Sequence, residues 1–99
     1  NGVTLKSAVL DWEKVLGDLE LRGWRVGDHY RPWGRSVDQK IADMFQRAKV
    51  PSWRRPFWPI VTNEGTILWA KQFGPAAEFV AGPEAGRVLR ILNAMVEDG

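Results

Sequence analysis

The sequence predicts an α+β fold, in which antiparallel strands accompany one main helix within a single small domain. Apolar and polar residues alternate over residues 19–25, as they do in a strand that buries one face. Apolar residues recur at helical spacing over residues 36–49, and two apolar runs within residues 58–70 flank a turn sequence. Strands grouped around one helix, without a strand–helix–strand repeat, are typical of α+β proteins.

Two strands are predicted in the first part of the chain. Residues 3–12 mix β-branched side chains with partial alternation and predict a strand or the approach to one, whereas residues 12–17 also fit a short helical turn. A glycine-containing turn signal separates them from residues 19–25. In this second segment we expect Leu19 and Leu21 to face the core and the two arginines to line the outer face. Gly23 interrupts the alternation and predicts a bulge.

The clearest helix signal covers residues 36–49. Ser36 stands three residues before Gln39, a capping-box pair that satisfies free N–H groups at the start of a helix. The helix is expected to end before Pro51, because the residue that precedes a proline avoids helical angles. One apolar face is predicted from residues at helical spacing: Val37, Ile41, Met44, Phe45 and Ala48.

The second half of the chain is predicted to contain a hairpin and a tail with two interpretations. Residues 51–56 form a proline-bounded turn or a one-turn helix, and residues 58–70 form the hairpin. A short strand is predicted for residues 78–80. Residues 87–96 fit a helix and a strand equally well, so both stay open at this point.

Composition limits the classes of protein to consider. A chain of 99 residues makes one domain, and 44% hydrophobic with 26% charged residues is ordinary for a globular protein. The chain has no cysteine and one histidine, which excludes disulfides, a cysteine nucleophile and a Cys-based zinc site. Only scattered carboxylates remain, so we expect no catalysis from this chain by itself. The absence of cysteine and of a long apolar run fits a cytoplasmic protein that does not enter a membrane.

Positive charge is concentrated in the middle of the chain. Residues 22–59 carry nine Lys and Arg residues against three Asp residues, a net charge of +6, whereas each flank carries −2. Seven of the nine are Arg, whose planar donor group binds phosphate oxygens and stacks on bases. This distribution favours a polyanion as partner, although a run of charge is also common on a simply solvated surface.

Four of the six tryptophans lie in the same basic segment. Cations interleaved with aromatic side chains are what a surface needs to follow a phosphate backbone and stack on exposed bases. Trp33 lies in a glycine-rich loop and is the best candidate for such stacking. Trp24, Trp53 and Trp58 are expected in the core, where tryptophan is more often found.

A series of motifs runs through residues 19–70. In order, it comprises the strand with Arg22 and Arg25, Gly27-Asp28, Arg31-Pro32, Gly34, Lys40 on the helix, Lys49-Val50-Pro51, Arg54 or Arg55, and a strand start at Pro59 followed by the hairpin. This series resembles the C-terminal substrate-binding domain of tRNA(Ile)-lysidine synthetases in order and approximate spacing. Family members often have Arg after Gly-Asp, where this chain has His29, so a contact there would be weaker or dependent on pH. Beyond Gly74 the match is less clear.

The resemblance implies a layered β-sandwich with helices and a role in holding tRNA. Members of the family use ATP to attach lysine to an anticodon cytidine of isoleucine tRNA, in an N-terminal catalytic domain with a Ser-Gly-Gly phosphate loop. That loop does not occur in this sequence, so ATP and Mg would belong to the parent enzyme and no cofactor is expected here. The implied partners are isoleucine tRNA, contacted on its body near the acceptor stem, and the parent's catalytic domain; a homodimer of the parent stays open. The start at Asn1-Gly2, without Met, fits a piece excised from a longer enzyme.

The residues expected to contact RNA come from the basic segment. Of the adjacent Arg54 and Arg55, we expect one to contact RNA and the other to be paired internally. Asp28 is expected to cap its own loop through hydrogen bonds rather than to act as a base. The complete set of predicted RNA-binding residues is Arg22, Arg25, Arg31, Trp33, Arg35, Lys40, Arg47, Lys49, Arg54 and Arg55.

Three alternatives compete with this hypothesis. The chain could be a protein-interaction module whose tryptophans are buried against the parent enzyme's other domains. It could be a separated enzyme, which the lack of a nucleophile–base pair or metal cluster argues against. On the helix, an ion pair between Asp43 and Arg47 would compete with an RNA contact by Arg47.

Overall fold

The computed structural model describes the backbone of residues 2–97 and the side chains of residues 8–91. It confirms the α+β class: antiparallel strands accompany one α-helix. In chain order the elements are β1 (Gly2–Asp11), the 3₁₀ helix η1 (Trp12–Lys14), β2 (Leu19–Arg22), β3 (His29–Tyr30), β4 (Gln39–Lys40), α1 (Ile41–Arg47), the 3₁₀ helix η2 (Ser52–Phe57), β5 (Ile60–Asn63), β6 (Thr66–Ala70), β7 (Gly74–Pro75), the 3₁₀ helix η3 (Ala77–Phe79) and β8 (Val88–Glu97).

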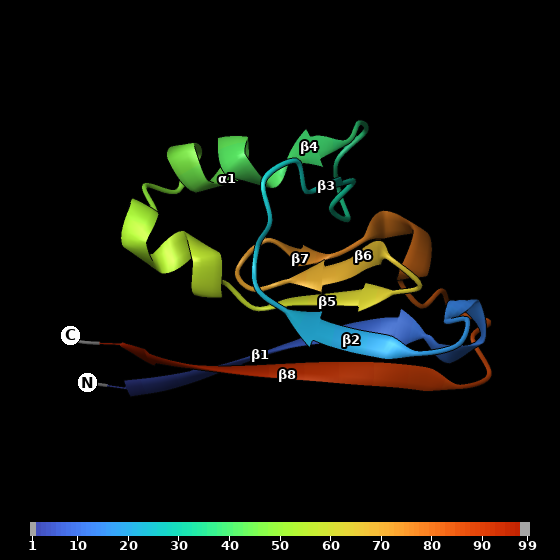
Figure 1. Ribbon diagram of the computed structural model, residues 1–99. Coiled ribbons are helices and arrows are strands. Elements are labelled where there is room, and N and C mark those ends of the chain that lie inside the picture. Colours follow the sequence, from blue (N-terminus) through green and yellow to red (C-terminus); the bar gives the residue numbers. More distant parts are fainter. Residues whose placement is uncertain (1, 98–99) are drawn as a thin grey trace.

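The strands form three antiparallel groups that appear as layers in Figure 1. At the bottom of that view, β1 and β8 form a long two-stranded ribbon that joins the two ends of the chain. In the middle lies a four-stranded sheet in the order β2-β5-β6-β7, and at the top lie α1 and the short pair β3–β4. The two interpretations of the tail are thereby resolved in favour of the strand, because β8 pairs along its whole length with β1.

One hydrophobic core holds the layers together. Its fully buried side chains come from the ribbon, the helix and the sheet: Leu10 of β1, Ile41 and Phe45 of α1, Ile60 of β5 and Leu68 of β6. Since each layer contributes to the same interior, no layer can separate without exposing apolar surface. This arrangement fixes α1 and the segment that follows it against the sheet.

The hairpin predicted for residues 58–70 is confirmed, with β5 and β6 as its strands. Its two turn residues, Glu64 and Gly65, have φ angles of 49° and 81°. Two positive φ angles define the turn type whose twist matches paired strands, and glycine takes the second position without strain. The proline-bounded segment before the hairpin is also helical as predicted, in the form of η2.

The main helix begins at Ile41, four residues later than a capping box with Ser36 as N-cap predicts. Residues 39–40 form β4 and pair with β3, so they are extended rather than helical. Helix α1 therefore starts at Ile41, whose N–H donates to the Asp28 carbonyl at 3.0 Å, and Lys40 precedes it without a side-chain cap. Because a strand partner was available, tertiary pairing overrode the local capping signal. Val37, predicted on the apolar face, is 61% exposed.

The prediction that Leu19 and Leu21 of β2 face the core and that Arg22 lies on the outer face is wrong. Arg22 pairs with the fully buried Ile60, and side chains directly opposite one another in an antiparallel pair share a face. Arg22 therefore points inward, while Leu21 on the other face is 71% exposed and Leu19 is 39% exposed. Alternation alone does not say which face of an edge strand is covered, and here an acidic partner makes a charge acceptable on the inner face.

Two smaller predictions are also wrong. The segment around residues 78–80 forms the 3₁₀ helix η3 instead of a strand. Gly23 does not mark a bulge; the irregularity of the sheet lies between β5 and β6, where Val61 pairs with Trp69 and Thr62 with Ile67, so that Leu68 of β6 is the extra residue. Gly23 is required for another reason: a Cβ atom there would lie 2.1 Å from the Pro56 carbonyl oxygen, because η2 packs directly on the end of β2.

Candidate nucleic-acid interface

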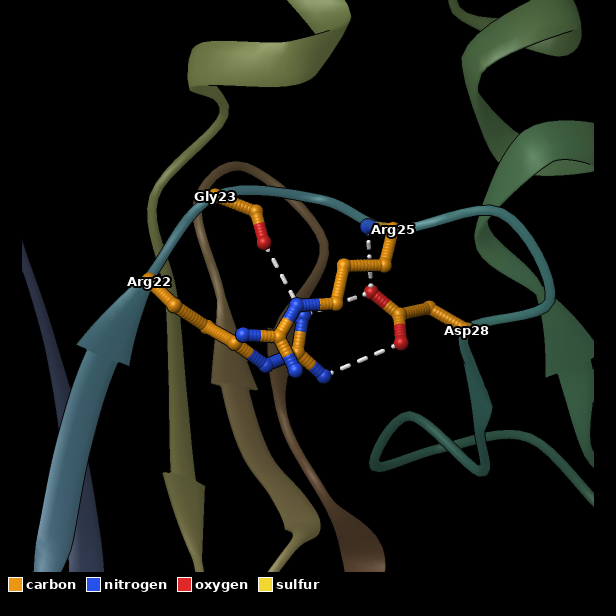
Figure 2. A network of polar contacts seen from close by, with 4 residues as sticks. All are labelled: Arg22, Gly23, Arg25 and Asp28. Carbon is orange, nitrogen blue, oxygen red and sulfur yellow. Dashed lines mark hydrogen bonds and ion pairs between the residues drawn. The ribbon is translucent and has the colours of Figure 1, made fainter.

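A partly buried ion pair fixes the loop that leads from β2 to the upper layer. Figure 2 shows the Arg22 guanidinium and the Asp28 carboxylate side by side, joined by two hydrogen bonds of 2.8 and 3.0 Å. The guanidinium also donates to the Gly23 carbonyl at 2.9 Å, and the Arg25 N–H donates to Asp28 at 2.8 Å. Only 12% and 11% of the two paired side chains remain exposed. The loop is thus tied at both ends.

The expected loop-capping role of Asp28 is confirmed by these contacts. Burial opposes the charged form of Asp28, but the hydrogen bonds from Arg22 and from the Arg25 N–H outweigh it and lower the pKa of this carboxyl below its usual value. Arg22, by contrast, is not on the outer face of the sheet. Its guanidinium is occupied by Asp28 and holds the loop, so it is not available to phosphate in this conformation.

The adjacent arginines of η2 point in different directions. Arg55 turns inward, where Nε and Nη2 donate to the Val50 carbonyl at 3.0 and 2.9 Å and the guanidinium lies 5.4 Å from the centre of the Phe45 ring. Arg54 is exposed and lies over the Trp58 ring, 5.6 Å from its centre. The internal role expected for one of the pair therefore falls to Arg55, and Arg54 is the arginine left at the surface.

A hollow of about 360 Å³, here called the Trp53 hollow, opens beside η2. Two cations, Arg54 and Lys71, line it, and both lie over the ring of the buried Trp58 at 5.6 and 5.7 Å. Two aromatic side chains at its rim are largely exposed: Trp53 at 74% and Phe57 at 83%. No acidic residue is among those that line it within the described part of the chain.

A second hollow of about 310 Å³, the Arg47 hollow, lies against α1. Arg35 and Arg47 line it together with apolar surface that includes Phe73. Arg47 donates to the Gln39 amide oxygen at 2.8 Å, and no ion pair to Asp43 occurs among the contacts described for residues 8–91. Phe73 stacks on Trp58 with 5.9 Å between ring centres, so this stacked pair contributes one ring to the lining of each hollow.

The loop between β3 and β4 presents Trp33 to solvent. Its indole is 66% exposed, although its backbone N–H is anchored to the Pro75 carbonyl at 2.9 Å. Arg31 donates to the Arg35 carbonyl at 3.3 Å and remains exposed. A ring held outward by a fixed backbone loses little freedom on stacking, so the geometry suits the contact predicted for Trp33.

The remaining predicted contacts are exposed but dispersed. Arg25 follows β2, Lys40 precedes α1, and Lys49 follows the helix with a φ angle of 57°. His29 Nδ1 lies within hydrogen-bond distance, 2.9 Å, of the exposed Asp38 carboxylate. Within residues 8–91, Arg22 is the one Lys or Arg side chain in an ion pair, so the other Lys and Arg side chains of the segment are not neutralised by described carboxylates.

The sequence placed the tryptophans partly correctly, and two residues of the candidate interface were missed. Trp58 is buried as expected and Trp24 packs against Phe45, but Trp53 is exposed. Lys71 and Phe57 were missed. Lys71 lies in a flank with net negative charge, and its only signal is its position directly after a buried strand.

Within the described part of the chain, no three His, Cys, Asp or Glu side chains lie close enough together to hold a metal ion. None of the helices that the structure describes has the length and hydropathy needed to span a membrane. The strand topology and the two hollows define the class: an α+β domain with exposed basic and aromatic side chains.

Comparison with known families identifies the domain more closely. Residues 19–91 match the family described as the TilS substrate C-terminal domain, and the chain belongs to this family. It is 49% identical over 82 residues to a tRNA(Ile)-lysidine synthase of Solibacter usitatus and 36% identical over 83 residues to that of Geobacter sulfurreducens. These alignments cover 83% and 75% of this chain but 19% and 18% of those proteins, so the chain spans about a fifth of their length.

Solved structures agree with this assignment. A crystal structure of a TilS C-terminal domain superposes with a TM-score of 0.77 at 29% identity, covering 94% of this chain and 72% of that one. An N-terminal fragment of the phenylalanyl-tRNA synthetase β-subunit from Pyrococcus horikoshii gives a TM-score of 0.68 at 8% identity, covering 91% of this chain and 28% of that one. The second likeness concerns the fold alone.

Proposed function

We propose that this chain is the tRNA-binding C-terminal domain of a tRNA(Ile)-lysidine synthase. In this proposal it holds the body of isoleucine tRNA near the acceptor stem while a separate N-terminal domain ligates lysine to the anticodon cytidine with ATP and Mg. The domain contributes binding and no catalytic group, and it works in the cytoplasm. Family membership and relatives with that enzyme name support the parent assignment.

One observation carries the binding proposal: the basic segment is left without carboxylate partners. Apart from Arg22, no Lys or Arg side chain of this segment is ion-paired within residues 8–91. Two hollows are lined by unpaired cations and aromatic rings, and each includes one ring of the Phe73–Trp58 stack. Cations without counter-ions beside aromatic surface are suited to phosphates and bases.

The proposed contacts are narrower than the ten residues predicted from the sequence. Arg22 and Arg55 serve the fold, so we assign them no RNA contact. The proposed RNA-binding residues are the exposed members of the predicted set, with Lys71 added: Arg25, Arg31, Trp33, Arg35, Lys40, Arg47, Lys49, Arg54 and Lys71.

A salt titration of tRNA binding tests this proposal. If the domain neutralises about five phosphates, the logarithm of the binding constant should fall against the logarithm of salt concentration with a slope of roughly −3.5 to −4.5. Replacing Arg35 and Arg47 together with Ala should reduce that slope by about one to two units. The matched control is Arg87→Ala with Arg90→Ala, two exposed arginines outside the basic segment, which should leave the slope unchanged.

A second function has its own support. Leu21, Val26 and Phe57 are 71%, 90% and 83% exposed, and apolar surface of this kind is typical of a face that packs on another domain. On this alternative, the domain would attach to the parent enzyme's other domains. A salt-independent association with those domains, together with no measurable binding to tRNA, would replace RNA binding with this function.

A further inference from the structure

The Trp53 hollow combines two features that the core does not require. Trp53 and Phe57 expose most of their aromatic surface, which costs free energy in water unless a partner covers it. Two further lining residues, Arg54 and Lys71, both lie over the single ring of Trp58. Two like charges gathered at one ring repel one another, and no acidic residue among the described lining offsets them.

The fold anchors the backbone of Lys71 and the ring that both cations contact. The Lys71 N–H donates to the Pro59 carbonyl at 3.0 Å, and the Lys71 carbonyl accepts from Trp58 Nε1 at 2.8 Å. Trp58 in turn is 3% exposed and stacked on Phe73. An anion entering the hollow would therefore meet two cations that both lie over one fixed ring.

We propose that the Trp53 hollow binds one unpaired nucleotide of the RNA, with Arg54 and Lys71 on its phosphate and Trp53 and Phe57 stacked on its base. This inference rests on the proposed tRNA binding and specifies the structural class of nucleotide that the site takes. A volume of about 360 Å³ lies at the small end of the range for ligand sites, which is roughly 300–1,000 Å³.

The aromatic pair is the reason to assign an unpaired nucleotide rather than a base pair. Inside an RNA helix the faces of the bases are covered by their neighbours, so a paired nucleotide within a duplex offers its phosphate to Arg54 and Lys71 but no base face to the two rings. An unpaired base exposes its face and stacks on aromatic side chains with little dependence on its identity. A protein segment would satisfy the rings but would leave the two cations without partners unless it also carried acidic residues.

The experiment compares two RNAs: a blunt-ended RNA duplex and the same duplex with a short unpaired tail. Binding of the 99-residue chain to each is measured by fluorescence anisotropy at one fixed salt concentration. The tail should tighten binding roughly tenfold. Replacing both Trp53 and Phe57 with Ala should abolish this gain and leave the affinity for the blunt duplex unchanged. Trp53→Phe, which keeps a ring, should retain the gain.

Trp12→Ala is the matched control, because Trp12 is also an exposed tryptophan, at 41%, but lies outside the hollow and outside the proposed RNA-binding set. It should leave the advantage of the tailed RNA intact. Equal affinity for the two RNAs, or a gain that survives loss of both rings, would overturn the nucleotide site. Salt-dependent binding of the blunt duplex would in that case still support the proposed function. Failure of both RNAs to bind would overturn the two proposals together.

Discussion

Replacing Asp28 with Asn should strongly destabilise the domain, although Asp28 lies in a loop rather than in a helix or strand. The substitution keeps the size of the side chain but removes the charge that faces Arg22, whose side chain is only 12% exposed. Breaking a buried pair by removing one partner costs about 3–5 kcal/mol, since the other charge stays buried without compensation. Asn still accepts a hydrogen bond from the Arg25 N–H, so we expect about 3 kcal/mol for Asp28→Asn.

For a domain of this size, that loss corresponds to a fall in Tm of roughly 15 °C. Urea unfolding followed by tryptophan fluorescence measures the free energy directly, and Trp24 on the tied loop packs edge-on against Phe45 with 5.3 Å between ring centres. Asp38→Asn is the matched control, because it breaks the His29–Asp38 pair, whose side chains are 63% and 59% exposed. That exposed pair should contribute no more than about 1 kcal/mol.

The same pair predicts how stability depends on pH. The pKa of Asp28 is lower in the folded state than in the unfolded chain, so the folded state binds fewer protons. This stabilisation is fully present above the unfolded pKa of about 3.9 and is lost as pH falls through the lowered folded value. Asp28→Asn should remove this part of the acid sensitivity. Equal losses of stability for Asp28→Asn and Asp38→Asn, or an acid profile unaltered by Asp28→Asn, would refute the argument.

Three further perturbations test the packing. Gly23→Ala should lower the free energy of unfolding in urea by about 2 kcal/mol or more, because the added Cβ would lie 2.1 Å from the Pro56 carbonyl oxygen. An unchanged free energy would contradict the close packing of η2 on the end of β2. Arg55→Ala should lower the free energy of unfolding by about 1–3 kcal/mol, because its hydrogen bonds to the Val50 carbonyl are lost, whereas Arg54→Ala should change it by no more than about 0.5 kcal/mol. A larger loss for Arg54→Ala than for Arg55→Ala would contradict the internal role of Arg55. Burial raises the pKa of Tyr30, the chain's one tyrosine. The free energy of unfolding should therefore fall once pH exceeds the tyrosine pKa of about 10 in the unfolded chain, and phenolate absorbance should appear together with unfolding. Phenolate absorbance that appears before unfolding would contradict the burial of Tyr30.

Local pattern was sufficient where each segment depended on its own residues. Turn chemistry predicts the hairpin, and proline restriction predicts the 3₁₀ helix that follows Pro51. Helical spacing predicts the apolar face of α1, which comprises Ile41, Met44 and Phe45. The loop cap at Asp28 was also predictable, because an aspartate two or three residues from free N–H groups satisfies them locally. These features needed no knowledge of distant partners.

Local pattern failed where a distant segment decided the outcome. Residues 39–40 became a strand because β3 was there to pair with them. Arg22 turned inward because its cross-strand partner is Ile60 and because Asp28 supplies the opposite charge. The site shows the same division: charge and tryptophan content pointed to the basic segment, but Lys71 reached it only through the hairpin that brings residue 71 beside Pro59.

By itself, the sequence determined the α+β class, the location of the charge and the kind of partner that this charge favours, because composition and short-range periodicity act within a few residues. Only the tertiary structure decided that Arg25 and Arg54 face solvent while Arg22 and Arg55 turn inward, and which tryptophans are buried. It also decided that Arg54 and Lys71 both lie over the ring of Trp58. Those outcomes depend on strand register and on the packing of η2 against β2, and residues far apart in the sequence set both.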